Sequence, residues 1–300
     1  MEQFQKFYEK KRVLVTGGAG FIGSHLVEKL VSLRAQVTVL DNFSTGCLNN
    51  LKNVANAITI LYSDVRSAYA CTKATVGHDI VFHLASFISV PDSIKQPELC
   101  HNINVAGTVN MLEACSKNKA KTLIFSSSSA VYGQTNKVVS EDDPLNPMSP
   151  YATSKLEAET ACKQYAALFG VDTAILRYFN VYGERQNPQG PYAAVVAKFT
   201  QQLLNGQPLT IFGDGTQTRD FINVSDVVQA NLALGMRENQ KGEVFNIGSG
   251  KSITLLELID QLEQELKVKR TTLDFQPPRY GDILNSKANC AKYKNFMRSH

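Results

Sequence analysis

The stretch that decides the fold is V-L-V-T-G-G-A-G-F-I-G, residues 13–23. Its first three residues form a short apolar run, which predicts a buried parallel strand. Glycines at positions 17, 18, 20 and 23 follow, and a helical pattern begins near Phe21. A sharp turn, a close approach of phosphate to backbone and tight helix packing each favour a residue without a side chain. The N-terminus of the helix would offer N–H groups to a pyrophosphate, although a glycine-rich turn without a ligand also explains this stretch taken alone.

A second predicted strand, residues 36–40, indicates that the turn binds a dinucleotide. Asp41 closes this strand, about 20 residues beyond the glycines, where a carboxylate can bind the adenosine ribose hydroxyls. Such a carboxylate repels a 2′-phosphate, and neither Asn42 nor Phe43 supplies a guanidinium to accept one. The pattern therefore predicts NAD rather than NADP; the alternative is that Asp41 is only a turn residue.

The composition describes an enzyme-sized globular protein. The chain has 300 residues, of which 43% are hydrophobic and 19% charged, enough for one large or two ordinary domains. Its net charge is +4 with scattered Lys and Arg, so we infer neither nucleic acid nor membrane as a partner. With no apolar run of ~20 residues and no apolar core in residues 1–11, we expect a cytoplasmic protein. The six isolated cysteines predict reduced thiols and no metal site.

Three further strand ends carry candidate site residues. Residues 57–61 read as a strand, and Asp64 after it is either an adenine contact or the N-cap of the next helix. Residues 79–85 read as a fourth strand, in which we interpret His83 as a hydrogen-bonded structural residue. We expect residues 89–93 to form a loop, residues 98–117 a long helix and residues 121–125 a fifth strand. Four serines, 126–129, leave that strand at the carboxyl edge of a parallel sheet, which favours a hydroxyl-lined pocket over a solvated loop.

Tyr151 and Lys155 are the candidate catalytic pair. Ser149 can cap a helix that has Pro150 at its first position and runs to about residue 169. Residues four apart share one face of a helix. A lysine ammonium and a helix N-terminus beside a phenol both favour the phenolate, and a bound nicotinamide cation would add to this, so we expect a lowered pKa for Tyr151 and a base that works near neutral pH. By itself, Y-x-x-x-K is common and would fit a surface pair.

Taken together, these motifs resemble one family over residues 11–294. They comprise T-G-G-A-G-F-I-G, H-L-A-S, N-x-x-G-T at 104–108, S-S-S-S-A-V-Y-G, Y-A-T-S-K, R-Y-F-N-V-Y-G at 177–183, G-D-G-x-x-x-R-D-F-I at 213–222 and F-N-I-G-S-G at 245–250. The chain resembles the extended short-chain dehydrogenase/reductases, and among them the nucleotide-sugar epimerases and dehydratases. The resemblance implies an α/β fold, a doubly wound parallel (Rossmann) sheet with a smaller C-terminal α/β substrate domain. We expect an NAD-binding domain at 1–178 and a nucleotide-sugar-binding domain at 179–300, some of whose segments return to the first.

The resemblance also implies the residues of two binding sites. We expect NAD to contact Gly17, Gly20, Phe21, Ile22, Gly23, Asp41, Asn42, Ser44, Gly46, Asp64, Val65, Leu84, Ala85, Ser86, Asn104, Tyr151, Lys155 and Tyr178. We expect the UDP-sugar to contact Ser89, Ser128, Ser129, Tyr151, Asn180, Val195, Phe212, Arg219, Arg279 and Ser286. Asn180, Arg219 and Arg279 match the positions that bind the diphosphate, a helix over 192–204 would cover the nucleotide, and a strand at 210–212 would lie beside the base.

The resemblance implies a shared first step, in which a base takes the sugar O4 proton while the C4 hydride passes to NAD⁺. Dehydratases of the family carry Asp-Glu just before V-Y-G, and decarboxylases a Glu, whereas this chain has Ser129 and Ala130. Neither can act as an acid or base at neutral pH. We therefore expect C4 epimerisation, with Ser128 bonded to O4, Tyr151 as base, and Lys155 tuning Tyr151 and binding a ribose hydroxyl.

The substrate and the assembly follow from the same likeness. Ser286 falls where epimerases restricted to plain hexoses carry a tyrosine, which favours UDP-N-acetylglucosamine, with UDP-glucose also accepted. The alternatives are a UDP-glucuronate or UDP-glucose 4-epimerase, a dTDP-glucose 4,6-dehydratase-like enzyme, and an NAD-binding scaffold without activity. We expect a homodimer in which helices near 98–117 and 150–169 pair with those of a second copy.

Overall fold

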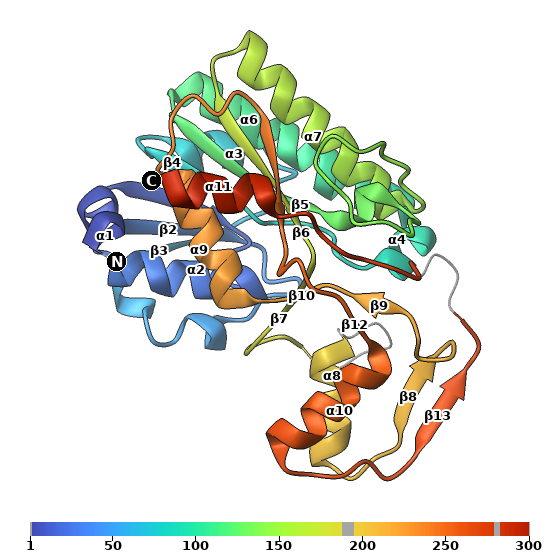
Figure 1. Ribbon diagram of the computed structural model, residues 1–300. Helices are drawn as coiled ribbons and strands as arrows, with labels where there is room; N and C mark the ends of the chain where they lie inside the picture. The colour runs from blue at the N-terminus through green and yellow to red at the C-terminus, as the bar shows by residue number, and fades with distance from the viewer. Residues whose placement is uncertain (1, 188–194, 279–282, 300) are drawn as a thin grey trace.

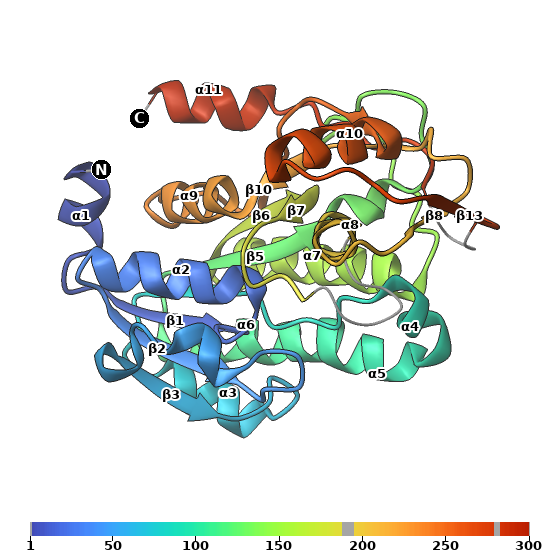
Figure 2. The same cartoon turned by 90° about the horizontal axis from the view of Figure 1, so that it is seen from below.

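A seven-stranded parallel sheet forms the centre of the computed structural model, which describes residues 2–187, 195–278 and 283–299. Helices cover both faces of the sheet (Figures 1 and 2). This confirms the predicted doubly wound fold. The strands, in order across the sheet, are β11 (Glu243–Ile247), β6 (Asp172–Tyr178), β5 (Thr122–Ser128), β4 (Ile80–His83), β1 (Arg12–Thr16), β2 (Gln36–Asp41) and β3 (Ile58–Tyr62).

Strand β1 is buried on both sides, as its unbroken apolar run predicts. Side chains alternate between the two faces of a strand, so Val13 and Val15 enter one core and Leu14 enters the other. The first core packs under α2 (Phe21–Ser32) and α9 (Val224–Gly235). The second packs under α3 (Ala68–Thr75), α6 (Gly107–Asn118) and α7 (Pro150–Leu168).

The order of the strands reverses at β1, and this fixes where a ligand can bind. The chain builds outward from β1 through β2 to β3, then returns to the opposite side of β1 for β4 and continues to β5 and β6. The connections after β1 and β4 therefore diverge at their carboxyl ends. In open α/β sheets this divergence leaves the crevice in which ligands bind.

A second lobe has a core of its own, at the lower right of Figure 1. It packs α8 (Val195–Leu204) and α10 (Leu255–Leu266) beside a parallel pair of strands, β8 (Leu209–Phe212) and β13 (Leu273–Gln276). The two halves of the chain are interleaved, because β11, α9 and α11 (Ala291–Ser299) come from the second half but lie with the central sheet. The predicted boundary at residue 178 stays a prediction.

Two segments differ from the predicted elements. The expected loop at 89–93 was wrong: α4 (Val90–Lys95) begins there, with Ser89 as its N-cap. Pro91 lies in the first helical turn, where its missing N–H costs nothing. The expected single helix consists of α5 (Pro97–His101), a π-helical turn η3 (Asn102–Ala106) and α6. The remaining elements are α1 (Glu2–Tyr8), η1 (Leu48–Leu51), η2 (Ala55–Ala57), η4 (Ser129–Tyr132), β7 (Asn180–Tyr182), β9 (Thr218–Arg219), β10 (Phe221–Asn223) and β12 (Ile253–Thr254).

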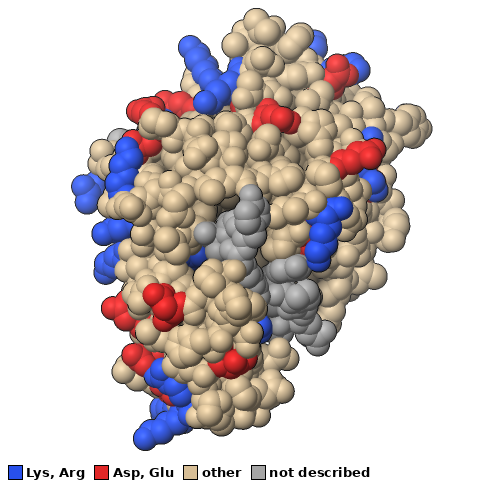
Figure 3. Space-filling model, turned by 90° about the vertical axis from the view of Figure 1, so that its right-hand side faces the viewer, with Lys and Arg blue, Asp and Glu red and all other residues tan. Residues whose placement is uncertain are grey.

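Outside the crevice, the described residues form neither a membrane-spanning helix nor a cluster of metal ligands. None of their helices is both long and apolar enough to cross a membrane. Lys and Arg are interspersed with Asp and Glu on the face that Figure 3 shows. Within the same described ranges, no three His, Cys, Asp or Glu side chains gather as metal ligands would. We therefore look for the functional site among the polar groups at the strand ends.

Candidate active site

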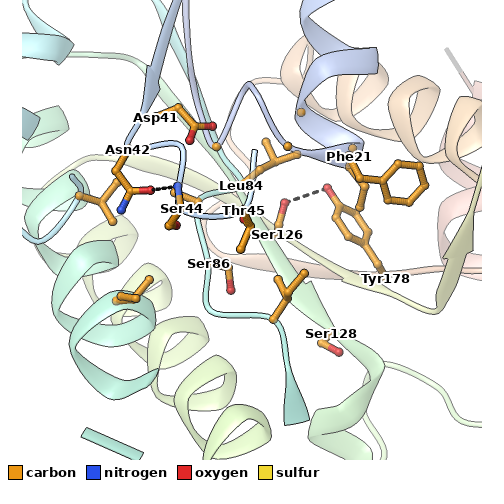
Figure 4. A pocket seen from close by; sticks show the side chains of 18 of the residues that line it. Phe21, Asp41, Asn42, Ser44, Thr45, Leu84, Ser86, Ser126, Ser128 and Tyr178 are labelled. Carbon is orange, nitrogen blue, oxygen red and sulfur yellow. Dashed lines mark hydrogen bonds between the residues drawn. The ribbon is translucent and has the colours of Figure 1, made fainter. Parts of the chain in front are cut away.

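A pocket of about 390 Å³ opens at the carboxyl ends of β1, β4 and β5, in the predicted crevice. Asp41 and Asn42 lie at one end, and Ser128 and Tyr178 lie at the other (Figure 4). Its volume is within the usual range for ligand sites. The predicted residues that line it are Gly17, Gly20, Phe21, Ile22, Gly23, Asp41, Asn42, Ser44, Asp64, Val65, Leu84, Ala85, Ser86, Ser128, Tyr151, Lys155 and Tyr178.

The glycine turn gives the pocket its anion-binding wall. Gly17 has φ +68°, and a Cβ on it would lie 2.7 Å from the backbone nitrogen of Ala85. A Cβ on Gly23 would lie 2.1 Å from the carbonyl oxygen of Gly17, so the turn and α2 can touch only without side chains. Gly20 caps α2 without a side-chain hydrogen bond, which leaves the first-turn N–H groups near Phe21 open to a phosphate.

Asp41 connects the second strand to the glycine turn. Its carboxylate accepts the N–H of Ala19 at 2.9 Å and the N–H of Phe43 at 2.8 Å. A carboxylate offers about four acceptor positions, so two remain for hydroxyl groups in the pocket. Among the described lining residues, the only Lys or Arg is Lys155, which is remote from Asp41 along the pocket. This agrees with a ribose that carries no 2′-phosphate.

Asp64 forms the neighbouring wall and is not a helix cap. Its carboxylate accepts from Asn42 at 2.7 Å and from the guanidinium of Arg66 at 2.8 Å. The hydrogen bond from Arg66 holds the pKa of Asp64 down at about 2. The cap of α3 is Ser67, whose hydroxyl accepts the N–H of Ala70, so the N-cap alternative for Asp64 was wrong.

At the other end of the pocket, α7 presents Tyr151 and Lys155 as the sequence predicts. Ser149 caps the helix by accepting the N–H of Ala152 at 3.1 Å, and Pro150 occupies the first position. Tyr151 and Ser128 line the pocket together, and the side chain of Ser128 is near enough to the phenol to lower its pKa. The first turn is also tied to α4, because the N–H of Tyr151 donates to the hydroxyl of the buried Ser93 at 3.1 Å.

The expected lowering of the Tyr151 pKa was wrong for the chain by itself. Burial raises the pKa of Tyr151 above its usual 10, and the nearby side chain of Ser128 only partly opposes this. The ammonium of Lys155 donates instead to the carbonyl oxygen of Ser126 at 2.7 Å and lies over the ring of Phe125. Burial lowers the pKa of Lys155 to about 8. A phenolate at Tyr151 therefore needs a further positive charge in the pocket.

Three predicted residues lie behind the pocket wall or support it. Asn104, in the π-helical turn, is buried; it accepts from Ser86 at 2.9 Å and donates to Ser154 at 2.9 Å. Gly46 packs on Ala19, where a Cβ would lie 2.7 Å from the backbone. The structural role predicted for His83 is confirmed: its ring bonds Thr16 and Thr108, and burial lowers its pKa to about 3.

Three of the predicted substrate residues, Asn180, Arg219 and Ser286, lie on or beside the short strands that join the two lobes. Asn180 begins β7, which pairs with β10, and its amide donates to the carbonyl oxygen of Asp220 at 3.2 Å. Arg219 precedes Asp220, and the N–H of Ser286 donates to Thr218 at 3.2 Å. Asn180, Arg219 and Ser286 therefore belong to one bonded group of strands. Ser89 caps α4, Ser129 opens η4, Val195 and Phe212 bound elements of the second lobe, and Arg279 and residues 192–194 lie outside the described residues.

Known proteins resemble this chain in sequence and in structure. Residues 13–248 match the model of the "NAD dependent epimerase/dehydratase family". The chain belongs to this family. It is 43% identical to a putative UDP-glucose 4-epimerase of Methanocaldococcus jannaschii over 90% of this chain and 87% of the relative. It is 37% identical to a UDP-N-acetyl-α-D-glucosaminuronate decarboxylase of Bacillus cytotoxicus, over 97% and 93% of the two chains.

A solved epimerase structure of the same family has the same fold. It is described as a UDP-N-acetylglucosamine 4-epimerase from Methanobrevibacter ruminantium in complex with UDP-N-acetylmuramic acid. The two structures superpose with a TM-score of 0.91 at 38% identity, covering 96% of this chain and 92% of the other. By their names, these relatives are epimerases and a decarboxylase, so they differ in what they do to a sugar nucleotide.

NAD, the cofactor of this family, fits the residues of the pocket. The glycine turn forms a cradle that a Cβ would fill, and the open N-terminus of α2 suits a pyrophosphate. Asp41 keeps acceptor positions for ribose hydroxyls at one end, while Tyr151 and Lys155 stand at the other, where the nicotinamide half would lie.

The hydroxyl-lined pocket predicted for serines 126–129 is confirmed for Ser126, Ser127 and Ser128, which line it. Other lining residues were not predicted. Gln186 follows β7, so only the return of the chain to the sheet brings it to the pocket. The lining residues absent from the predicted set are Leu40, Thr45, Ser63, Ile88, Ile103, Phe179, Val181 and Gln186.

Proposed function

We propose that this chain is an NAD-dependent UDP-sugar 4-epimerase that works through a transient 4-keto sugar. The observation that carries this proposal is the position of Tyr151, which lines the same pocket as Ser128 and Lys155. The carboxylates among the described lining residues are Asp41, at the end away from Ser128, and Asp64, which is bonded to Asn42 beside Asp41. The sugar would therefore meet a phenol base but no lining carboxyl group that could divert the ketone to elimination.

The side chains around the sugar would divide the work of proton transfer. Ser128 would hydrogen-bond the sugar O4, and Tyr151 would take its proton as general base. Bound NAD⁺ supplies the acceptor for the C4 hydride and places a positive charge beside the phenol. Ser129 and Ala130 hold the positions of the acidic pair of dehydratases and supply no acid or base. Return of the hydride to the other face of C4, with the proton from Tyr151, would complete the epimerisation.

We further propose UDP-N-acetylglucosamine as the preferred substrate, with UDP-glucose also accepted. The small Ser286, bonded beside Thr218 and Arg219, would leave room for an acetamido group. The Methanobrevibacter relative, with an N-acetylated sugar nucleotide bound, supports this choice. The Methanocaldococcus relative supports a plain hexose instead. Asn180, Arg219 and Arg279 would bind the diphosphate.

A substrate panel with a single variant tests the proposal. Purified protein is incubated with UDP-N-acetylglucosamine, UDP-glucose and UDP-glucuronate, and products are identified by NMR. We expect C4 epimers, fastest with the acetamido sugar, and a fall in kcat of about 10²–10⁴-fold in Tyr151→Phe, because the base is lost. A decarboxylated or 4-keto-6-deoxy product would refute epimerisation, and equal function in Tyr151→Phe would favour a scaffold.

A further inference from the structure

The end of β5 lies against α7 at three successive residues. The carbonyl oxygen of Ser126 accepts from the ammonium of Lys155 at 2.7 Å. The hydroxyl of Ser127 donates to the carboxylate of Glu159 at 2.5 Å. The side chain of Ser128 lies close enough to the phenol of Tyr151 to lower its pKa, and both residues line the pocket. The helix residues involved are four apart, so they follow one another along the same face of α7.

Glu159, the member of this series without a proposed chemical role, forms an ion pair inside the protein. Glu159 and Arg177 are each 1% exposed. Arg177 donates through Nε to one carboxylate oxygen at 2.9 Å and through Nη2 to the other at 2.7 Å. This bidentate geometry fixes the plane and position of the carboxylate, which a single contact would not do.

The ion pair is held in turn from two other parts of the fold. Nη1 of Arg177 donates to the hydroxyl of Tyr132 at 2.9 Å and to the carbonyl oxygen of Glu141 at 3.1 Å. The Tyr132 hydroxyl donates to Asn246 in β11 at 2.7 Å. The carboxylate of Glu159 is thus fixed from β6, from β11 and from the segment that follows β5. Among the described residues, its remaining hydrogen bond is to Ser127, so the position of the carboxylate also fixes the end of β5.

We propose that Glu159 and Arg177 are positioning residues for the proposed epimerase reaction, because they fix the register of β5 against α7 at which Ser128 meets Tyr151. Ser127 is the link, since its hydroxyl bonds Glu159 and its backbone is continuous with the catalytic serine. A buried ion pair is costly to desolvate and is weak evidence of stabilisation by itself. This pair is instead placed where a shift of the strand end would separate the two reacting side chains. The inference rests on the proposed function.

Charge gives the pair a second effect that can be measured. The ammonium of Lys155 is faced by Glu159 and Cys162 on α7, Cys100 on α5 and His83 on β4. Of these, Glu159 is the residue that carries a negative charge at neutral pH. Burial lowers the pKa of Lys155, and Cys100, Cys162 and the carboxylate of Glu159 oppose this lowering, in that order. Removing that charge would make Lys155 lose its proton at lower pH.

Four variants of the full-length, NAD-loaded enzyme separate position from charge and from simple damage. Ser127→Ala removes the link, Glu159→Gln removes the charge, and Glu159→Asp keeps the charge but withdraws it by one methylene. Thr173→Val is the matched control, because its buried hydroxyl bonds the carbonyl oxygen of Cys162 on the same helix, away from the pocket. Turnover is expressed per bound NAD, so that loss of folded protein does not count as loss of catalysis.

We expect kcat to fall about tenfold in Ser127→Ala and about 10²-fold in both Glu159 variants, with KM nearly unchanged. The alkaline limb of the pH profile should move to lower pH in Glu159→Gln and stay in place in Glu159→Asp. Should Glu159→Gln fail to fold, Ser127→Ala and Glu159→Asp still decide the question. Turnover per bound NAD in Ser127→Ala and Glu159→Asp equal to that of Thr173→Val would overturn the positioning role. Wild-type turnover is measured first, because its absence would refute the proposed function instead.

Discussion

Tyr151 is placed where the proposed base is needed, but the pKa of its phenol is raised rather than lowered. Its position on α7, its closeness to Ser128 and its place in the pocket all suit a base. Burial nevertheless raises its pKa, and Lys155 points its ammonium at Ser126 rather than at the phenol. Since an adjacent positive charge favours a phenolate, we expect bound oxidised nicotinamide to lower the pKa of Tyr151 and so to activate the proposed base.

A titration of the phenol tests this effect of NAD⁺ on the pKa of Tyr151. In NAD-free protein we expect Tyr151 to titrate above pH 10, as measured by phenolate absorbance against a Tyr151→Phe blank. Saturation with NAD⁺ should lower its pKa, because the oxidised nicotinamide adds a positive charge beside the phenol. NADH provides the matched comparison, because its nicotinamide ring carries no positive charge. Equal titrations with NAD⁺ and NADH would contradict this account.

At the scale of elements, the first turn of α7 is the part of the scaffold that most directly positions the base. Ser149 accepts the N–H of Ala152, and Ser93 of α4 accepts the N–H of Tyr151. Two hydroxyls thus satisfy N–H groups that a helix end leaves without partners. The same turn carries Tyr151, the proposed base, so fraying of this helix end would lower activity as well as stability.

Removal of the α7 cap should therefore lower both stability and activity, whereas removal of the cap of a helix in the second lobe should lower stability alone. Ser149→Ala is expected to cost about 1 kcal/mol, lowering Tm by about 2–4 °C for a chain of this size, and to reduce kcat severalfold. Thr254→Ala removes the matched cap of α10 in the second lobe, which bonds the N–H of Glu257. It should lower Tm similarly and leave kcat unchanged. A kcat equally reduced in both variants would show that the effect is not specific to α7.

Elements whose signals are local could be predicted from the sequence, and those that depend on distant partners could not. The glycine turn, the cap of α7 and the pairing of Tyr151 with Lys155 on one face all follow from short spacings. Helix α4 was missed: a loop was expected at 89–93, where Pro91 lies in the first helical turn, a position that proline suits. The bond between Ser127 and Glu159 joins residues 32 apart, and the shift of the Tyr151 pKa depends on burial. The homodimer stays a prediction.

At the scale of the whole molecule, the site combines a rigid sheet edge with a second lobe. The sheet and α7 supply the cofactor wall and the proposed catalytic pair, while Asn180 and Arg219 stand on the strands that lead to the second lobe. Arg219 donates to the carbonyl oxygens of Thr218 and Leu284, which orients its guanidinium. Binding of the nucleotide diphosphate and chemistry on the sugar would therefore be separable.

Substitution of Arg219 tests that separation. Arg219→Ala should raise KM for the UDP-sugar about 10–100-fold, because a charge-assisted hydrogen bond contributes about 1.5–3 kcal/mol, while kcat and bound NAD change little. Arg219→Lys should fall between the two, since lysine keeps the charge but not the bidentate fork. Arg34→Ala, at an exposed ion pair with Glu9, serves as the remote control. A fall in kcat with KM unchanged would instead assign Arg219 to the chemical step, and loss of bound NAD would assign it to the cofactor site.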